Sequence, residues 1–227
     1  MPSKNIIKQY SEGTYYHAYN RGVEKRPIFI DDQDCHVFLR YIKLYLSSQQ
    51  YILNLSEKEL KTRRFVNLNM SSDVELHCFA LMPNHFHLLI KNKTKNGIAK
   101  FMQRLITAYV MYFNKKYKRV GPLFQGVFKA STVDNDSYMM HLSRYVHNNS
   151  LKLSHEKINF QNYSSLQYYV GDRTAEWLKT EMIVSYFKDT FKPGNFKSSY
   201  ASFVESNIED SMALLDNLNL SLEDICV

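Results

Sequence analysis

The apolar segment from Val74 to Lys91 constrains the fold of this chain more than any other part of its sequence. Val74 to Met82 is rich in strand-forming residues, Pro83-Asn84 is a tight-turn pair, and His85 to Lys91 returns as a second apolar run. This pattern predicts a β-hairpin, to which the flanking elements can be added.

The flanking elements are predicted from their periodicity and from the turn and capping residues at their ends. They are a strand over residues 14–20, a helix from Asp31-Asp32 to about residue 45, a helix over about residues 97–113, a strand from Val127 to Val133 and a helix from about residue 134 to Asn148. Residues 47–72 are polar and weakly periodic, and we expect a loop or a short helix inserted between core elements.

The order of these elements is β-α-β-β-α-β followed by one more helix. This order is typical of the ferredoxin-like α+β fold, an antiparallel sheet with helices on one face. We expect this unit, with its extra helix, to occupy residues 1–165. Residues 166–227 are expected to form a helical subdomain, which is acidic because ten acids and only five bases follow residue 170.

The charge of the chain is concentrated in one segment. The chain has 29 Lys and Arg against 22 Asp and Glu, and residues 91–130 hold ten of these cations and no acid. A charge run is often only a solvated surface, but a positive field this dense favours a polyanion such as nucleic acid. Candidate DNA contacts are Arg104, Lys115, Lys116, Lys118, Arg119 and Lys129. Tyr109, Tyr112 and Tyr117 lie among them and either stack on bases or belong to the core.

The sequence gives no sign of export or of membrane contact. No stretch approaches the roughly 18 apolar residues that span a bilayer, and the first residues lead into no apolar signal segment. Cys35, Cys78 and Cys226 are far apart, which suits a reducing compartment. We therefore expect a cytoplasmic protein.

Two histidines of the hairpin are candidates for metal binding. His85 and His87 are two apart on a strand, so their imidazoles project from the same face and could coordinate a divalent ion together. The His-x-His spacing alone is weak evidence, because most such pairs bind nothing.

The helix that follows residue 134 carries a candidate nucleophile. Tyr145 and Asn149 are four apart and share a helical face, with His141 one turn earlier. If this helix crosses the sheet near the histidines, Asn149 could complete the metal site and Tyr145 would lie close to the ion. A nucleophile beside a Lewis acid is the arrangement needed for attack on a phosphodiester.

The chain resembles the REP-associated tyrosine transposases, which are single-tyrosine HUH transposases of the IS200-like type. Four blocks within about residues 14–150 carry the resemblance: Tyr16-His17 with Asn20-Arg21-Gly22, Leu81 to Leu89, Gly121 to Gly126 with Phe128-Lys129, and Arg144 to Asn149. Two positions depart from the family pattern. Ser150-Leu151 follows Asn149 where Pro-Val is usual, and Val127 stands where arginine is common.

The resemblance implies an enzyme that nicks and rejoins single-stranded, hairpin-bearing DNA through a covalent 5′-phosphotyrosine. It implies Tyr145 as nucleophile, and His85, His87 and Asn149 as ligands of Mg²⁺ or Mn²⁺. Arg21 becomes a further candidate DNA contact. The resemblance also implies a location in the bacterial cytosol with the nucleoid, and it allows a homodimer that exchanges the tyrosine helix.

Two other interpretations stay open at this stage. The first is a non-catalytic nucleic-acid-binding protein of ferredoxin-like fold, such as a degenerate or domesticated transposase. The second is a zinc hydrolase built on His85 and His87, which would need further His or Asp ligands nearby. The coincidence of the histidine pair with Tyr145 and Asn149 favours the transposase.

Overall fold

The computed structural model describes residues 10–55, 69–151, 153, 157–171, 173–190 and 196–206. Its strands are β1 (Tyr15–Arg21), β2 (Val74–Met82), β3 (His85–Asn92) and β4 (Lys129–Val133). Its helices are α1 (Asp32–Leu46), α2 (Gln49–Leu53), α3 (Gly97–Lys116), α4 (Asp136–Leu151), α5 (Leu166–Val170), α6 (Glu181–Thr190) and α7 (Phe196–Glu205), with 3₁₀ turns at Val23–Lys25 and Phe160–Tyr163.

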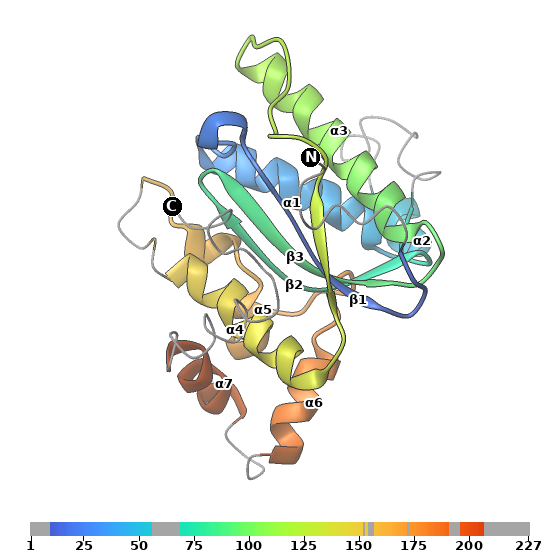
Figure 1. Ribbon diagram of the computed structural model, residues 1–227, viewed down its shortest axis with the longest axis vertical. Coiled ribbons are helices and arrows are strands. Elements are labelled where there is room, and N and C mark those ends of the chain that lie inside the picture. The colour runs from blue at the N-terminus through green and yellow to red at the C-terminus, as the bar shows by residue number, and fades with distance from the viewer. Residues whose placement is uncertain are drawn as a thin grey trace.

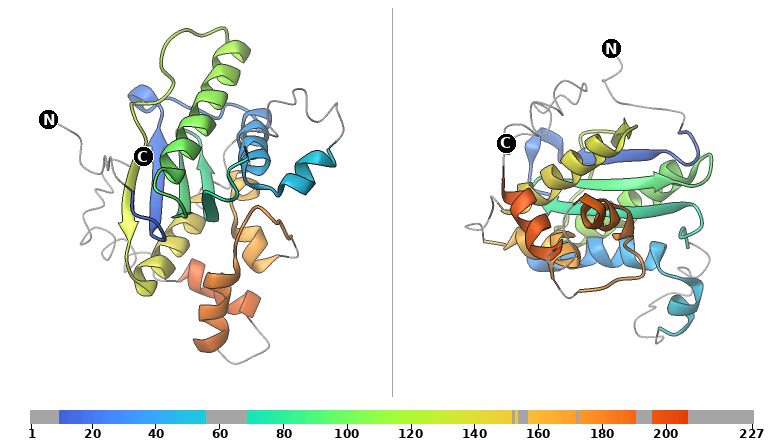
Figure 2. Two further views of the ribbon diagram at one scale, coloured as in Figure 1. Left: turned by 90° about the vertical axis from the view of Figure 1, so that its right-hand side faces the viewer. Right: turned by 90° about the horizontal axis from the view of Figure 1, so that it is seen from below.

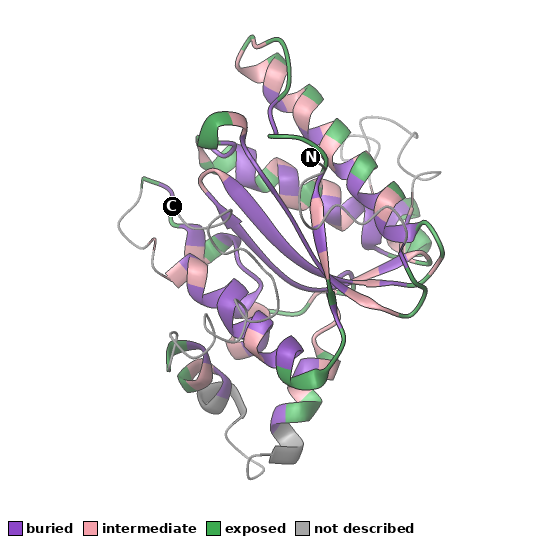
Figure 3. Cartoon of the chain, in the orientation of Figure 1, coloured by how far each residue is buried: buried purple, intermediate pink, exposed green. Residues whose placement is uncertain are grey.

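The four strands form one antiparallel sheet in the order β2-β3-β1-β4 (Figure 1). The predicted ferredoxin-like order of elements is therefore confirmed, and the hairpin of β2 and β3 is joined at Pro83-Asn84 as expected. The central strands β1 and β3 are buried almost throughout (Figure 3). Their continuous burial follows from cover on both faces of the sheet.

The helices divide between the two faces of the sheet (Figure 2). α1 and α3 pack on one face against the side chains of β1 and β3 that alternate inward there, including Ala18, Phe86 and Leu88. α4 packs on the other face, in a second cluster that includes Tyr19 and Leu89. The two crossover helices thus share one face as predicted, and the extra helix takes the opposite face.

Local capping chemistry sets where the helices begin. α1 begins after Asp31, whose carboxylate accepts from the backbone of Asp34 while the Asp34 side chain accepts in return from the backbone of Asp31. α4 begins where the Asn135 side chain accepts from the backbone N–H of Tyr138 at 2.7 Å.

Two predicted boundaries differ from the structure. β4 begins at Lys129 rather than Val127, because hydrogen bonds to the end of β1 hold the preceding residues as a loop: Gln125 N–H donates to the Arg21 carbonyl, and the Asn20 amide donates to the Gly126 carbonyl. The predicted insertion at 47–72 contains α2 in its first part, while its residues 56–68 lie outside the described residues.

The helices after residue 165 share a core with α4. Tyr169, Ile183 and Tyr200 belong to the same apolar cluster as Leu142 and Val146 of α4. The predicted helical C-terminal part is thus packed on the extra helix, while the proposed domain boundary at 165 stays a prediction. None of the described helices combines the length and apolar character needed to cross a bilayer.

A buried polar network joins this C-terminal part to α4. His147 is fully buried, with Nδ1 2.8 Å from the Tyr200 hydroxyl and Nε2 2.6 Å from Ser165 Oγ. Ser165 Oγ in turn accepts from the backbone N–H of Phe79 on β2. The side chain of Asn148 donates to the Val204 carbonyl of α7 at 2.9 Å. These bonds fix the position of α4 over the sheet.

The burial of His147 predicts a pH dependence of stability. Burial lowers the pKa of His147 to about 3, whereas the unfolded chain protonates this side chain near 6.5. The unfolded state therefore binds more protons below pH 6.5, and stability falls as the pH falls. Urea unfolding measures how the free energy of unfolding changes with pH. Between pH 6 and 5, His147→Gln should reduce this slope by roughly 1 kcal/mol per pH unit relative to the wild type. Between pH 7 and 8 the two slopes should coincide, and equal slopes at pH 5 to 6 would contradict the prediction.

Candidate active site

The pairing of β1 with β3 assembles a polar surface on the face of the sheet that α4 covers. In this register Tyr19 lies opposite His87 and Arg21 lies opposite His85. Paired residues point to the same side of a sheet, so these four side chains share the α4 face. His85 and His87 themselves lie side by side, with ring centroids 4.9 Å apart.

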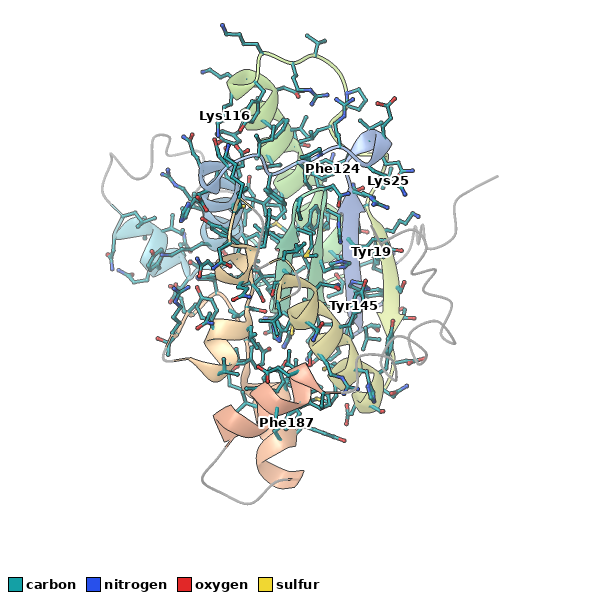
Figure 4. All side chains as sticks on the ribbon, turned by 90° about the vertical axis from the view of Figure 1, so that its left-hand side faces the viewer. Tyr19, Lys25, Lys116, Phe124, Tyr145 and Phe187 are labelled. Atoms are coloured by element: carbon teal, nitrogen blue, oxygen red, sulfur yellow. The ribbon has the colours of Figure 1, made fainter. Side chains whose placement is uncertain are left out.

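α4 brings Tyr145 to this histidine pair (Figure 4). The ring centroid of Tyr145 lies 5.5 Å from that of His87, and both side chains are buried. Tyr145 is thus beside the predicted metal ligands although about sixty residues separate them along the chain. The structure brings these three candidate residues together within a single chain.

Sequence reasoning missed a third imidazole at this site. His17 of β1 is fully buried, and its Nε2 lies 2.9 Å from Nδ1 of His87. Its ring centroid is 6.5 Å from that of Tyr145. The sequence does place His17 an even number of residues before Arg21, so that both side chains point to the same face of the strand. Only the β1–β3 register shows that His17 meets His87.

The turn before β3 supplies a second missed residue. The Nδ1 atom of His85 lies 2.6 Å from the side-chain oxygen of Asn84. The amide nitrogen of Asn84 donates to the Lys25 carbonyl at 3.2 Å. Asn84 therefore serves more than the tight turn that its sequence position indicates.

Burial keeps the three imidazoles neutral. It lowers the pKa of His85 to about 3, with the nearby Arg21 cation and His17 as smaller causes. It also lowers the pKa of His17 to about 3, and that of His87 well below 6.5. Neutral imidazoles carry the lone pair that a metal requires.

The buried polar atoms that have no hydrogen-bond partner within the described part of the chain include four on this face. They are His17 Nδ1, His87 Nε2, Ser131 Oγ and the Tyr138 hydroxyl. Ser131 lies opposite His17 in the β1–β4 register, and Tyr138 is in the first turn of α4. Unpartnered buried polar atoms are rare in native structures, so their gathering here indicates a place for a polar ligand or an ion.

The donor set fits a divalent ion only in part. His85 and His87 offer two nitrogen donors, but no described group of three His, Cys, Asp or Glu side chains is arranged to hold a metal. A zinc hydrolase needs such a group. Asn149 is half-buried one turn after Tyr145, and no described hydrogen bond joins its amide to either imidazole. Its place as third ligand stays a prediction.

The structure separates the candidate DNA contacts into groups. Arg21 is beside His85, and Lys129 pairs with Tyr19 in the β1–β4 register, so both belong to the α4 face. α3, which carries Arg104 and Lys115, covers the opposite face of the sheet. The guanidinium of Arg104 contacts the sulfur of Met70.

The end of α3 extends beyond the sheet at the end where His85 lies. Lys118 and Arg119 follow α3 and lead into a loop that bonds back to the turn after β1, through Val23 N–H and the Leu123 carbonyl (Figure 1). Lys118 is exposed, with a left-handed backbone at φ 51°. These cations therefore lie beside the polar end of the sheet.

Lys116 is better explained as a structural residue than as a DNA contact. Its ammonium group lies 2.7 Å from a carboxylate oxygen of Asp31 and 2.8 Å from one of Asp34, which is fully buried. The hydroxyls of Tyr112 and Tyr117 donate to Asp34 as well. The charge of Lys116 is thus already neutralised, and these aromatic side chains join α1 to α3.

Tyr109 belongs to the core. It is fully buried, and its hydroxyl donates to the backbone carbonyl of Ile28. The core alternative of the tyrosine-stacking hypothesis is therefore the one that the structure supports for Tyr109.

Comparison with known proteins finds a family and solved structures that are similar to this chain. Residues 47–149 match the model of a family described as IS200-like transposases, a range a little under half of the chain that includes His85, His87 and Tyr145. A solved structure of a REP-associated tyrosine transposase bound to a REP hairpin is similar at 14% identity, covering 74% of this chain and 85% of that chain, with a TM-score of 0.45. No curated protein matches. Over residues 47–149 the family match agrees with the IS200-like part of the resemblance found in the sequence.

The two adjacent lysines at the end of α3 should behave differently on substitution. Lys116→Ala leaves the buried carboxylate of Asp34 without its counter-charge. We therefore expect the free energy of unfolding, measured by chemical denaturation, to fall by about 3 kcal/mol. Lys115→Ala is the matched control, because Lys115 is exposed and should change stability by less than about 0.5 kcal/mol. Equal effects of the two substitutions would contradict the buried ion pair.

Proposed function

We propose that this chain, whose residues 47–149 match the IS200-like transposases, is a metal-dependent transposase that cuts and rejoins single-stranded DNA with Tyr145 as its nucleophile. The observation that carries the proposal is the convergence of Tyr145 with His85 and His87. The Nε2 atom of His87 is buried there with no hydrogen-bond partner among the residues that the structure describes, as a metal ligand would be before its ion is bound.

The chemistry follows from the groups on this face. A divalent ion held by His85, His87 and Asn149 would polarise the scissile phosphate and stabilise the departing 3′ oxygen. The two nitrogen donors favour Mn²⁺ over Mg²⁺, because Mg²⁺ strongly prefers oxygen ligands. Arg21, beside His85, adds a fixed positive charge where the phosphate would lie.

Tyr145 performs the transfer. Its hydroxyl oxygen forms a bond to phosphorus while its proton passes to water, the bond from phosphorus to the 3′ oxygen breaks, and the 3′ oxygen takes up a proton from water to become a free 3′-hydroxyl. The 5′-phosphotyrosine keeps the energy of the broken bond. Attack by a 3′-hydroxyl on this ester restores the phosphodiester and the tyrosine, so rejoining needs no ATP.

The same chain supplies both the nucleophile and the histidines. α4 is bound to its own C-terminal helices through His147 and Asn148, and these bonds hold Tyr145 beside His87. We therefore propose a site that is complete within one chain. A homodimer that exchanges α4 would have to break these buried contacts.

The proposed substrate is a single strand with a hairpin, as the family resemblance implies. The exposed Lys118 and the half-buried Arg119 after α3 lie toward the same end of the sheet as the buried Arg21, where a DNA backbone would meet all three.

A non-catalytic nucleic-acid-binding protein of the same fold is the second candidate. The position of α3 favours it, because most of the basic segment covers the face opposite Tyr145. A passive binder would hold DNA without forming an adduct, so one experiment separates the two candidates.

The first test is covalent capture of a hairpin-bearing single strand in the presence of Mn²⁺. Tyr145→Phe should abolish the protein–DNA adduct and leave DNA affinity within about threefold, because only the attacking oxygen is lost. Tyr41→Phe, on α1 at the opposite face of the sheet, is the control and should still form adducts. Adducts that persist in Tyr145→Phe would assign the nucleophile elsewhere, and their absence from the wild type would favour the passive binder.

The second test is removal of a metal ligand. His85→Ala should lower the rate of Mn²⁺-dependent cleavage by about 100-fold or more, because the loss of one of the few donor atoms weakens the binding of the ion and changes its position. His36→Ala, an exposed histidine of α1, should cleave like the wild type. Cleavage that is as fast in EDTA as in Mn²⁺ would be incompatible with a metal role.

A further inference from the structure

We propose that Asn84 and His17 are positioning residues that hold His85 and His87 in the tautomer whose Nε2 atom carries the free lone pair. This inference deepens the proposed function, because it concerns the same two imidazoles as metal ligands. Neutral imidazole has one N–H, and the hydrogen bond made by one ring nitrogen decides which nitrogen remains available to a metal.

The tautomer of His85 follows from two contacts of Asn84. The amide nitrogen of Asn84 donates to the Lys25 carbonyl at 3.2 Å, which identifies it as the nitrogen of the carboxamide. The other atom, an oxygen that can only accept, therefore faces Nδ1 of His85 at 2.6 Å. His85 Nδ1 must carry the hydrogen, and Nε2 is left as a lone-pair donor.

The loop that supplies the Lys25 carbonyl is rigidly held. Glu24 and Lys25 have left-handed backbone conformations, with φ of 56° and 58°, which non-glycine residues adopt at a cost in energy. Hydrogen bonds fix this loop against the β2–β3 turn, since Gly22 N–H donates to the Asn84 carbonyl and Ile28 N–H to the Pro83 carbonyl, both at 2.8 Å. The loop thus sets the orientation of the Asn84 side chain.

The proposed tautomer of His87 depends on its contact with His17. Their rings are stacked at 5.1 Å and 20°, with His17 Nε2 and His87 Nδ1 2.9 Å apart. Either nitrogen could donate in this pair, but only donation by His87 Nδ1 leaves a lone pair on His87 Nε2. The hydrogen of His17 then sits on Nδ1, and His17 contributes an acceptor, without itself binding the ion.

The two positioning contacts come from different strands and act on different rings. Asn84 precedes β3 and contacts only His85 of the two, whereas His17 on β1 contacts only His87. Each residue can therefore be changed while the other imidazole serves as an internal control.

The test is long-range ¹H–¹⁵N NMR of the histidine rings in metal-free protein at pH 7. Both His85 and His87 should carry hydrogen on Nδ1. Asn84→Ala should shift His85 toward the Nε2–H form and leave His87 unchanged, and His17→Phe should do the reverse. Asn84→Asp and His17→Gln each keep an acceptor and should retain the wild-type tautomers.

A Mn²⁺ titration of the same proteins gives the second measurement. Asn84→Ala and His17→Phe should each weaken Mn²⁺ binding by about 10- to 100-fold, and the two acceptor-keeping variants should recover most of it. Backbone amide spectra report whether each variant is folded, and one that is not is replaced by Asn84→Gly or His17→Leu, which also remove the acceptor.

The outcomes separate this inference from the proposed function. Nε2–H on either ring in the wild type, or unchanged tautomers in both Asn84→Ala and His17→Phe, would overturn the positioning role even if Mn²⁺ binds. The expected tautomers and shifts without any Mn²⁺ binding would uphold the positioning contacts and overturn the metal-dependent function instead.

Discussion

The register between β1 and β3 is the constraint on which the candidate site depends. It sets Tyr19 opposite His87 and Arg21 opposite His85, and it brings His17 within hydrogen-bond distance of His87. A slip of one residue would turn every β1 side chain to the other face of the sheet, because side chains alternate along a strand. The apolar residues between them, such as Ala18 and Phe86, prevent such a slip because they are required in the core beneath α1 and α3.

The second requirement is that α4 stays in its position over the sheet, where Tyr145 lies beside His87. Apolar contacts hold its underside, and the bonds of His147 and Asn148 connect it to the C-terminal helices. The C-terminal part therefore does more than complete the core, since it braces the helix that carries Tyr145. If Tyr145 is the nucleophile, as proposed, its side chain is already held in place, so little conformational entropy has to be lost when substrate binds.

The sequence was sufficient to predict the order of elements, because hydrophobic periodicity and the turn residues at Pro83-Asn84 are local signals. It also identified His85, His87 and Tyr145 as a group, through strand and helix spacing and through the family resemblance. Their roles are still predictions. What local signals cannot contain is which strands lie next to each other and in which register.

For that reason the sequence did not show that His17 contacts His87, or that Asn84 contacts His85 in addition to its place in the turn.

For Lys116 the sequence indicated a role that the structure does not support. Its sequence context is a run of cations, which indicates a solvated or DNA-binding surface. Its actual partners, Asp31 and Asp34, come from a helix about eighty residues earlier and are known only once α1 and α3 are packed together.

The opposite placement of α3 and α4 has a mechanical consequence for the proposed substrate. A polymer that reaches Tyr145 and also touches the cations after α3 has to curve around the edge where the loop after β1 meets the β2–β3 turn. Duplex DNA, with a persistence length of about 150 base pairs, resists a bend over so short a path, whereas an unpaired strand follows it at little cost. For the proposed substrate, the position of the sheet would therefore favour a flexible strand before any base is recognised.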